Sequence, residues 1–196
     1  MLLRRVRSWG LRGRLLYTAA VSEGHTVWLV GMMGAGKSTV GPVLAARLHR
    51  AYVDTDAEIE RSAGCSVAEI FDREGEAAFR ARERELIDAL AGSDAVVSLG
   101  GGAIAQAGMQ ERLARAGTVV YLRARADTLL ARLGSCLDRP LLRDLPPAQR
   151  EGRIAALLDA RKGAYESAGI VVDTDAGRVP DLVEELLERL RNGGVA

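Results

Sequence analysis

The sequence predicts an α/β fold: a five-stranded parallel sheet with helices on both faces, plus a loop that acts as a lid. Five short apolar runs have the length and composition of buried strands, and they alternate with longer segments in which apolar residues recur at helical spacing. Strands that alternate with helices form a parallel sheet covered on both sides. With 196 residues, of which 48% are hydrophobic, the chain can bury one substantial core. The five runs are 27–30, 51–53, 95–99, 118–122 and 170–172.

The composition argues against several classes of partner. The chain has 27 lysines and arginines and 26 acidic residues, so its charge gives no reason to expect a nucleic acid or an anionic membrane. No apolar run approaches the length of a membrane-spanning helix. Cys65 and Cys136 lie outside any metal-binding spacing, as is typical of reduced thiols in the cytoplasm. We therefore expect a cytoplasmic protein with no nucleic-acid or membrane partner. We also expect a monomer, although the sequence does not show the oligomeric state.

The chain divides into a basic extension, one domain and a short tail. Residues 1–25 are rich in arginine, and no acidic residue occurs before Glu23. They could be an organellar targeting peptide, but serine is sparse, and we favour a disordered extension or a start placed upstream of the true one. Residues 26–192 are predicted to form a single domain, and 193–196 a tail.

The first strand leads into the strongest motif of the chain. Residues 31–38, GMMGAGKS, fit the pattern G-x-x-x-x-G-K-[S/T], the P-loop that binds the phosphates of a nucleoside triphosphate. Its glycines let successive backbone N–H groups point into one concavity, and the helix that follows adds its positive N-terminal end. Lys37 can reach the outer phosphates, and the Ser38 hydroxyl can ligate Mg²⁺. Lysine occurs elsewhere only at Lys162, although arginine is abundant.

Carboxylates and glycines follow the next two strands. Asp54 and Asp56 come directly after 51–53, at the edge where open parallel sheets bind ligands. Three glycines at 100–102 follow 95–99. Glycines after a buried strand indicate a backbone that passes very close to another group. Both segments are therefore candidates for the binding site.

Local signals mark the predicted helix boundaries. Ser66 and Glu69 form a capping box that opens one helix, and Gly64 and Gly134 close two others. Gly75 separates two helical segments. The predicted helices are 38–50, 58–63, 66–71, 76–90, 104–116, 127–133, 150–165 and 179–191.

Two further features carry charge. Arg80 and Glu83 lie one turn apart on a predicted helix, so they can act as a pair. The stretch 135–149 holds three prolines and the arginines Arg139 and Arg143, and a loop of this length is a candidate lid. The guanine-reading motif N-K-x-D of GTP-binding switch proteins is absent. A short P-loop chain with such a loop indicates a kinase that acts on a small molecule.

The chain resembles the shikimate kinase family over about residues 26–192. Six segments occur in the order and approximate spacing of that family, and together they are very specific. The resemblance implies that the chain transfers the γ-phosphoryl group of ATP to the 3-hydroxyl of shikimate, with Mg²⁺ as cofactor. The six segments are GMMGAGKST at 31–39, VDTDAEIE at 53–60, SVAEIFDREGEAAFRARE at 66–83, SLGGGA at 98–103, RPLL at 139–142 and RKGAY at 161–165.

The resemblance also implies roles for residues on the acceptor side. Arg80 and Arg161 would bind the shikimate carboxylate, as bidentate guanidinium groups do. Asp56 would accept from the ring hydroxyls and orient the hydroxyl proton, and Glu83 would orient Arg80. Asp54 would hold Mg²⁺ through water. The backbone of Gly100, Gly101 and Gly102 completes the implied substrate site, with the Gly101 N–H as donor.

On the nucleotide side, Lys37, Mg²⁺ on Ser38 and Arg139 from the lid would stabilise the charge of the transition state. Arg132 would pack on adenine, and Arg178 is a second candidate near the nucleotide. The implied catalytic residues are Lys37, Asp56 and Arg139. The implied ATP-binding residues are Gly34, Ala35, Gly36, Lys37, Ser38, Thr39, Arg132, Arg139 and Arg178.

The chain departs from the family pattern in two places. Residues 162–164, KGA, stand where the family often has an apolar or proline-containing segment, and Glu166 follows Tyr165. The loop 173–178 is shifted by one residue, which leaves the role of Arg178 open. Two other functions stay possible: another small-molecule kinase, such as a gluconate kinase, or a regulatory module that binds nucleotide without turnover.

Overall fold

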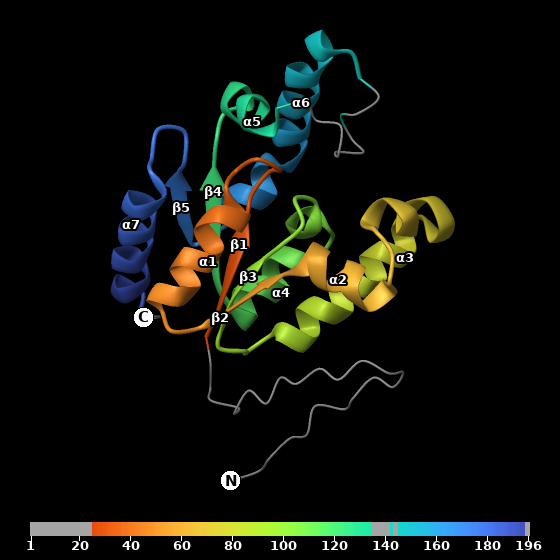
Figure 1. The fold of residues 1–196 in the computed structure, drawn as a ribbon. Helices are drawn as coiled ribbons and strands as arrows, with labels where there is room; N and C mark the ends of the chain where they lie inside the picture. The colour runs from red at the N-terminus through yellow and green to blue at the C-terminus, as the bar shows by residue number, and fades with distance from the viewer. Residues whose placement is uncertain (1–24, 135–141, 143–144, 195–196) are drawn as a thin grey trace.

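The computed structural model describes residues 25–134, 142 and 145–194. Its centre is one five-stranded sheet with the order β2-β3-β1-β4-β5, in which every neighbouring pair is parallel (Figure 1). This confirms the predicted fold class. The strands are β1 (Thr26–Val30), β2 (Ala51–Asp54), β3 (Ala95–Ser98), β4 (Gly117–Arg123) and β5 (Ile170–Asp173).

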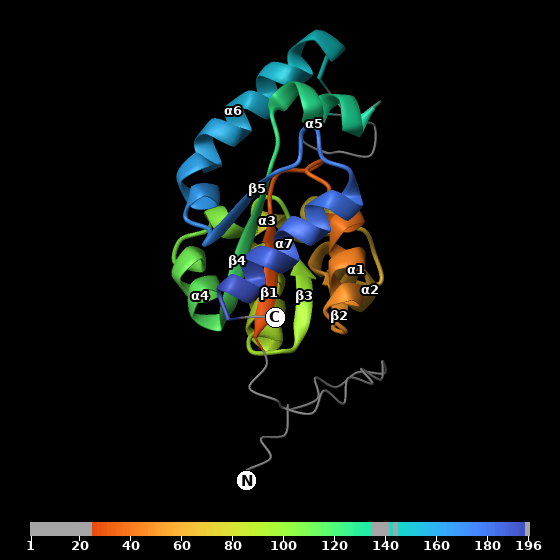
Figure 2. The same ribbon diagram turned by 90° about the vertical axis from the view of Figure 1, so that its left-hand side faces the viewer.

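Helices connect the strands and cover both faces of the sheet. Figures 1 and 2 show α1 and α7 on one side, and α4 with the end of α3 on the other. Along α3, Gly75 takes a non-helical conformation, so the helix consists of the two segments that the sequence predicts. The helices are α1 (Lys37–Arg47), α2 (Thr55–Ala63), α3 (Val67–Leu90), η1 (Ala103–Ala105, a 3-10 turn), α4 (Met109–Ala116), α5 (Ala126–Leu133), α6 (Pro147–Glu166) and α7 (Val179–Asn192).

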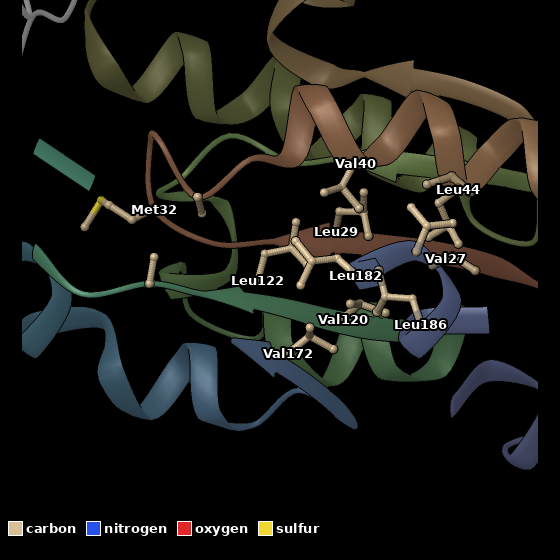
Figure 3. Close-up of a cluster of buried hydrophobic side chains, with 14 of the residues drawn as sticks. Val27, Leu29, Met32, Val40, Leu44, Val120, Leu122, Val172, Leu182 and Leu186 are labelled. Carbon is tan, nitrogen blue, oxygen red and sulfur yellow. The ribbon is translucent and has the colours of Figure 1, made fainter. Parts of the chain in front are cut away.

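The central strand β1 shows why the sheet is buried on both sides. Its side chains alternate between two apolar clusters, because successive residues of a strand point to opposite faces. Val27 and Leu29 pack with Leu44 of α1 and Leu186 of α7 (Figure 3). Trp28 packs on the opposite face, with residues of α3, α4 and α6. Burial on both faces fixes the position of β1 in the sheet, and the site is built at the end of this strand.

Several predicted helix boundaries are wrong, and three of them have a clear local reason. The helix α2 begins at Thr55 and not at 58, because the Asp54 side chain caps it. The predicted helix 104–116 is interrupted, because Gly108 takes a left-handed conformation (φ 73°) between η1 and α4. The helix α6 begins at Pro147, since proline suits the first turn of a helix.

Some predictions fall outside the described residues. The extension 1–25 lies there except for its last residue, as do most of the predicted lid, the end of the tail and Arg139. Across 25–134, 142 and 145–194, no helix has the length and apolar character needed to cross a membrane.

Candidate active site

The site is a cavity of about 600 Å³ at the carboxyl ends of β1, β2 and β3. This is the edge where open α/β sheets bind ligands. Its wall combines the P-loop with the carboxylates and glycines that follow the next two strands. The residues predicted for the site that line the cavity are Gly34, Ala35, Gly36, Lys37, Ser38, Thr39, Asp54, Asp56, Gly100, Gly101, Arg132 and Arg178.

The P-loop has a backbone that only glycine adopts easily. Gly34 and Gly36 have φ of 81° and 97°, in the left-handed region. A Cβ at Gly31 would lie 2.6 Å from the carbonyl oxygen of Leu122, so the loop also packs too closely on β4 for a larger residue. The Lys37 ammonium group donates to the carbonyl oxygens of Gly31 (2.8 Å) and Met32 (3.2 Å). These bonds hold the lysine across its own loop, beside the start of α1.

Asp54 closes β2 and caps α2. Its Oδ1 accepts hydrogen bonds from the backbone N–H groups of Asp56 (3.1 Å) and Ala57 (3.3 Å). The hydroxyl of Thr55 donates to the carbonyl oxygen of Ser98 (3.2 Å), which ties this turn to the end of β3. The capping therefore fixes the backbone that carries Asp56 into the cavity.

Asp56 and Glu83 approach each other at Gly100. A Cβ at Gly100 would lie 2.7 Å from Oδ1 of Asp56 and 2.9 Å from Oε1 of Glu83. Both oxygens are buried without a hydrogen-bond partner among the described residues. Glycine is needed here because two carboxylates occupy the space of a side chain.

The burial of these two carboxylates changes their titration. Burial raises the pKa of Asp56, and the nearby charge of Asp54 raises it further, while Lys37 and Arg80 oppose the change. Burial also raises the pKa of Glu83, whose side chain is 0% exposed, although Arg80 pulls that pKa down in part. The site thus holds carboxylate oxygens that have no hydrogen-bond donor. An incoming hydroxyl group could supply that donor.

Arg80 lies on α3, where acidic and aromatic side chains surround its guanidinium group. Its Nη1 donates to Oε2 of Glu83 at 2.7 Å, and its Nε and Nη2 donate to Oε1 of Glu76 at 3.2 Å. The guanidinium group lies over the Phe79 ring, 5.2 Å from the centroid. A Cβ at Gly102 would lie 2.7 Å from Nη2 of Arg80, so the guanidinium packs directly against the glycine backbone.

Arg161 approaches the same backbone from α6. Its Nη1 donates to the carbonyl oxygen of Gly101 at 3.0 Å and contacts the Met32 sulfur at 3.7 Å. Arg80 and Arg161 thus contact the neighbouring glycines Gly102 and Gly101 from two different helices, and Gly101 lines the cavity. Neither arginine lines the cavity itself; each reaches it through a glycine of the 100–102 segment.

Of the three arginines predicted to bind the nucleotide, Arg132 and Arg178 are among the described residues, and they differ in how firmly they are held. Arg132 donates to the hydroxyl (3.0 Å) and the carbonyl oxygen of Thr174, and to the carbonyl oxygen of Gly34 (3.4 Å). It therefore bridges the P-loop and the loop after β5. Arg178 is paired with Asp181 at 2.9 Å, and its side chain is 82% exposed. It lies at the edge of the cavity with its guanidinium engaged on its own helix.

The site also contains residues that the sequence analysis did not assign. The Tyr165 hydroxyl donates to the carbonyl oxygen of Gly101 at 2.5 Å, and Nε2 of Gln106 donates to Oε2 of Glu83 at 2.6 Å. Tyr165 follows Arg161 by four residues, so helical spacing could have placed both on one face. No sequence signal marks Gln106, because its contact depends on the break between η1 and α4.

These features define the class of the protein. A P-loop that connects a buried central strand to a helix, at the ligand-binding edge of a parallel sheet, is the site of a P-loop protein that binds a nucleoside triphosphate. The family model described as shikimate kinase matches residues 33–191. The chain belongs to the shikimate kinase family, as the motifs predict, and it is an ATP-dependent kinase.

Known relatives agree with this assignment. The shikimate kinase of Chlorobium chlorochromatii is 44% identical over 174 residues, which are 86% of this chain and 92% of that protein. The structure of shikimate kinase from Acinetobacter baumannii in complex with shikimate has a TM-score of 0.81 and 37% identity, and the match covers 88% of this chain and 96% of that one. A gluconokinase from Sinorhizobium meliloti, at 18% identity and a TM-score of 0.53, shares the fold alone.

Proposed function

We propose that this cavity transfers the γ-phosphoryl group of ATP to the 3-hydroxyl of shikimate, giving shikimate 3-phosphate and ADP. One observation carries the proposal: Asp56, Arg161 and Arg80 each contact one of the three successive glycines at 100–102, and Gly100 and Gly101 line the same cavity as the P-loop. Shikimate carries one carboxylate and three hydroxyls. Two guanidinium groups beside a buried carboxylate and a glycine backbone match that set of groups.

On the nucleotide side, backbone N–H groups of the P-loop would hold the phosphates at the positive end of α1. Lys37 would exchange its bonds to Gly31 and Met32 for the outer phosphate oxygens. Arg132, held by Thr174, would present its guanidinium plane to the adenine. Arg139 and Arg178 remain proposed contacts, the first outside the described residues and the second exposed.

On the acceptor side, Arg80 and Arg161 would bind the carboxylate of shikimate through charge-assisted hydrogen bonds. Asp56 would accept a hydrogen bond from the hydroxyl group that attacks, and would hold or take up its proton at Oδ1. Because that oxygen is buried without a partner, the hydroxyl would satisfy it on binding. Glu83 would keep Arg80 in place through their 2.7 Å ion pair.

The residues present fit a magnesium ion bound together with ATP. Ser38, Asp54 and Asp56 offer oxygen ligands in one cavity, and oxygen is the ligand that Mg²⁺ prefers. The described residues contain no group of three or more His, Cys, Asp or Glu side chains that could hold a metal alone. Ser38 would therefore bind the ion with phosphate oxygens, and Asp54 would act through water. The ion would neutralise charge on the phosphates.

The test is an assay of ADP release with ATP and Mg²⁺ and a panel of acceptors: shikimate, gluconate, a nucleoside monophosphate and none. We expect turnover with shikimate alone. Turnover only with another acceptor would show that the two arginines serve a different substrate. Absence of turnover with every acceptor, in a folded protein that binds ATP, would contradict the proposal and favour a regulatory module.

A further inference from the structure

The carbonyl group of Gly101 accepts two hydrogen bonds from one helix. The Tyr165 hydroxyl lies 2.5 Å from this oxygen, and Nη1 of Arg161 lies 3.0 Å from it. The two donors are four residues apart on α6, so they share one face of the helix. Together they use both lone pairs of the carbonyl oxygen. Arg161 has an implied role in substrate binding, whereas Tyr165 has none.

These bonds fix the direction of a backbone N–H group. A trans peptide points its carbonyl and its N–H to opposite sides, so a fixed Gly101 carbonyl aims the N–H of Gly102 away from α6. The preceding peptide is fixed in the same way, because the Gly100 carbonyl accepts from the N–H of Ala103 at 3.0 Å. Glycines carry no side chain that could anchor this segment, so its orientation depends on such bonds.

The fixed peptide also lies between the two arginines that are proposed to bind the substrate carboxylate. Arg161 contacts it at the Gly101 carbonyl, and Arg80 packs against Gly102 from the other helix. The position of this peptide therefore affects the spacing of the two guanidinium groups. A shift of the backbone would alter both contacts at once.

Tyr165 is itself held rigidly. Its side chain is 1% exposed, and its ring stacks on Tyr121 of β4 with centroids 4.8 Å apart and an interplanar angle of 6°. Burial raises the pKa of the Tyr165 hydroxyl, so it stays protonated and able to donate. Tyr165 thus connects the glycine segment to β4.

We propose that Tyr165 is a positioning residue for the acceptor: its hydroxyl sets the Gly101–Gly102 peptide and, through it, the Gly102 N–H group and the two arginines that contact this peptide. With Tyr165 as a second donor, Arg161 can turn toward a carboxylate without leaving the Gly101 carbonyl unpaired. Without that hydroxyl, Arg161 alone satisfies the carbonyl, and this bond competes with binding of the substrate. The inference rests on the proposed function, which places the acceptor at these groups.

The test compares Tyr165→Phe with Tyr121→Phe. Each substitution removes one hydroxyl from the same stacked pair and keeps the ring, but only the first removes the bond to Gly101. Tyr121 instead lines a separate hollow with Arg123 and Lys162. For Tyr165→Phe we expect KM and Kd for shikimate to rise about tenfold, as for the loss of one buried hydrogen bond, with KM for ATP changed less than about twofold. Tyr121→Phe should stay close to the wild type.

Kd is measured by calorimetry with shikimate alone, and the Tm of each variant is recorded with and without shikimate. A Tyr165→Phe protein that binds shikimate as tightly as the wild type would overturn the proposal. Equal rises in KM for shikimate and ATP, in step with a lower Tm, would show a structural role only and would also overturn it. If the wild type itself neither binds nor phosphorylates shikimate, the proposed function fails, and this result is distinct from the other two.

Discussion

The two halves of the cavity are built in different ways. The nucleotide half comes from one continuous segment, 31–39, whose glycines shape a backbone that can bind phosphate. The acceptor half is assembled from the start of α2, the middle of α3, the glycines after β3 and the end of α6. The first half relies on backbone groups, and the second on charged side chains that are partly or fully buried.

This difference has a consequence for specificity. Backbone N–H groups and a helix N-terminus bind the phosphates of any nucleoside triphosphate. The nucleotide half therefore determines whether phosphoryl transfer occurs at all. Buried carboxylates and guanidinium groups tolerate few partners, because each must be paired in the complex. Substitutions in the nucleotide half should therefore lower the rate of transfer to every acceptor. Substitutions in the acceptor half should lower the rate with one acceptor only.

The largest effect is expected for Lys37→Met. Lys37 is the one P-loop side chain with a full positive charge, and it lies beside the N-terminus of α1. We expect kcat to fall by at least about 1,000-fold with every acceptor, since phosphoryl transfer depends on charge stabilisation. The ADP-release assay measures this, and Lys162→Met, at the only other lysine, serves as control. Appreciable turnover by the Lys37 variant would contradict the assignment.

Asp56→Asn should impair catalysis through the acceptor half alone. We expect kcat for shikimate to fall by at least about 100-fold, because the amide accepts a proton far less readily than the carboxylate. ATP affinity should persist, and stability should not fall, since the change removes a buried charge that lies close to Asp54. Rates with shikimate and ATP binding by calorimetry are compared with those of Asp72→Asn, an exposed site. Full activity in Asp56→Asn would show that another group orients the hydroxyl.

Arg80→Ala should lower kcat/KM for shikimate by about 100-fold through weaker substrate binding. It should also destabilise the fold by roughly 3 kcal/mol, because Glu83 would be left buried without its ionic partner. Arg73→Ala, which removes an exposed α3 arginine paired with Glu69, is the matched control and should change neither quantity appreciably. Kinetics and denaturant unfolding measure the two effects. An Arg80 variant with unchanged KM for shikimate would place the carboxylate elsewhere.

The same contrast explains what the sequence could predict. Short apolar runs identified all five strands, because burial on both faces requires them, and the P-loop pattern located the phosphate end of the cavity. The pairing of Arg80 with Glu83 followed from helical spacing alone. Each of these predictions depended only on residues that are close together in the sequence.

Contacts between distant segments could not be predicted in this way. The meeting of Asp56 and Glu83 at Gly100 depends on how α2, α3 and the end of β3 pack together. The bond from Gln106 to Glu83 exists because Gly108 interrupts a segment that has the periodicity of one helix. The family resemblance supplied the acceptor residues, but it did not supply the hydrogen bonds by which Tyr165 and Gln106 support them.

The smallest effect, and the most specific to the buried half, concerns pH. A protonated Asp56 accepts hydrogen bonds more weakly, so affinity for shikimate should decrease as the pH falls through the raised pKa of Asp56. Asp54 contributes to that raised pKa, so Asp54→Asn should lower the pKa and move the loss of affinity to lower pH. Asparagine can still cap α2 through its side-chain oxygen.

Calorimetric titrations with shikimate over a series of pH values, without ATP or Mg²⁺, measure this shift. The carboxylate of shikimate titrates in the same way with the wild type and with each variant, so its contribution cancels in the comparison. Glu58→Gln on the same helix is the control, because Glu58 is paired with Arg61 and is not among the groups that shift the pKa of Asp56. If the two variants show the same pH dependence, Asp54 does not act on Asp56 through its charge. The raised pKa of Asp56 would then come from burial and from its other charged neighbours, such as Glu60.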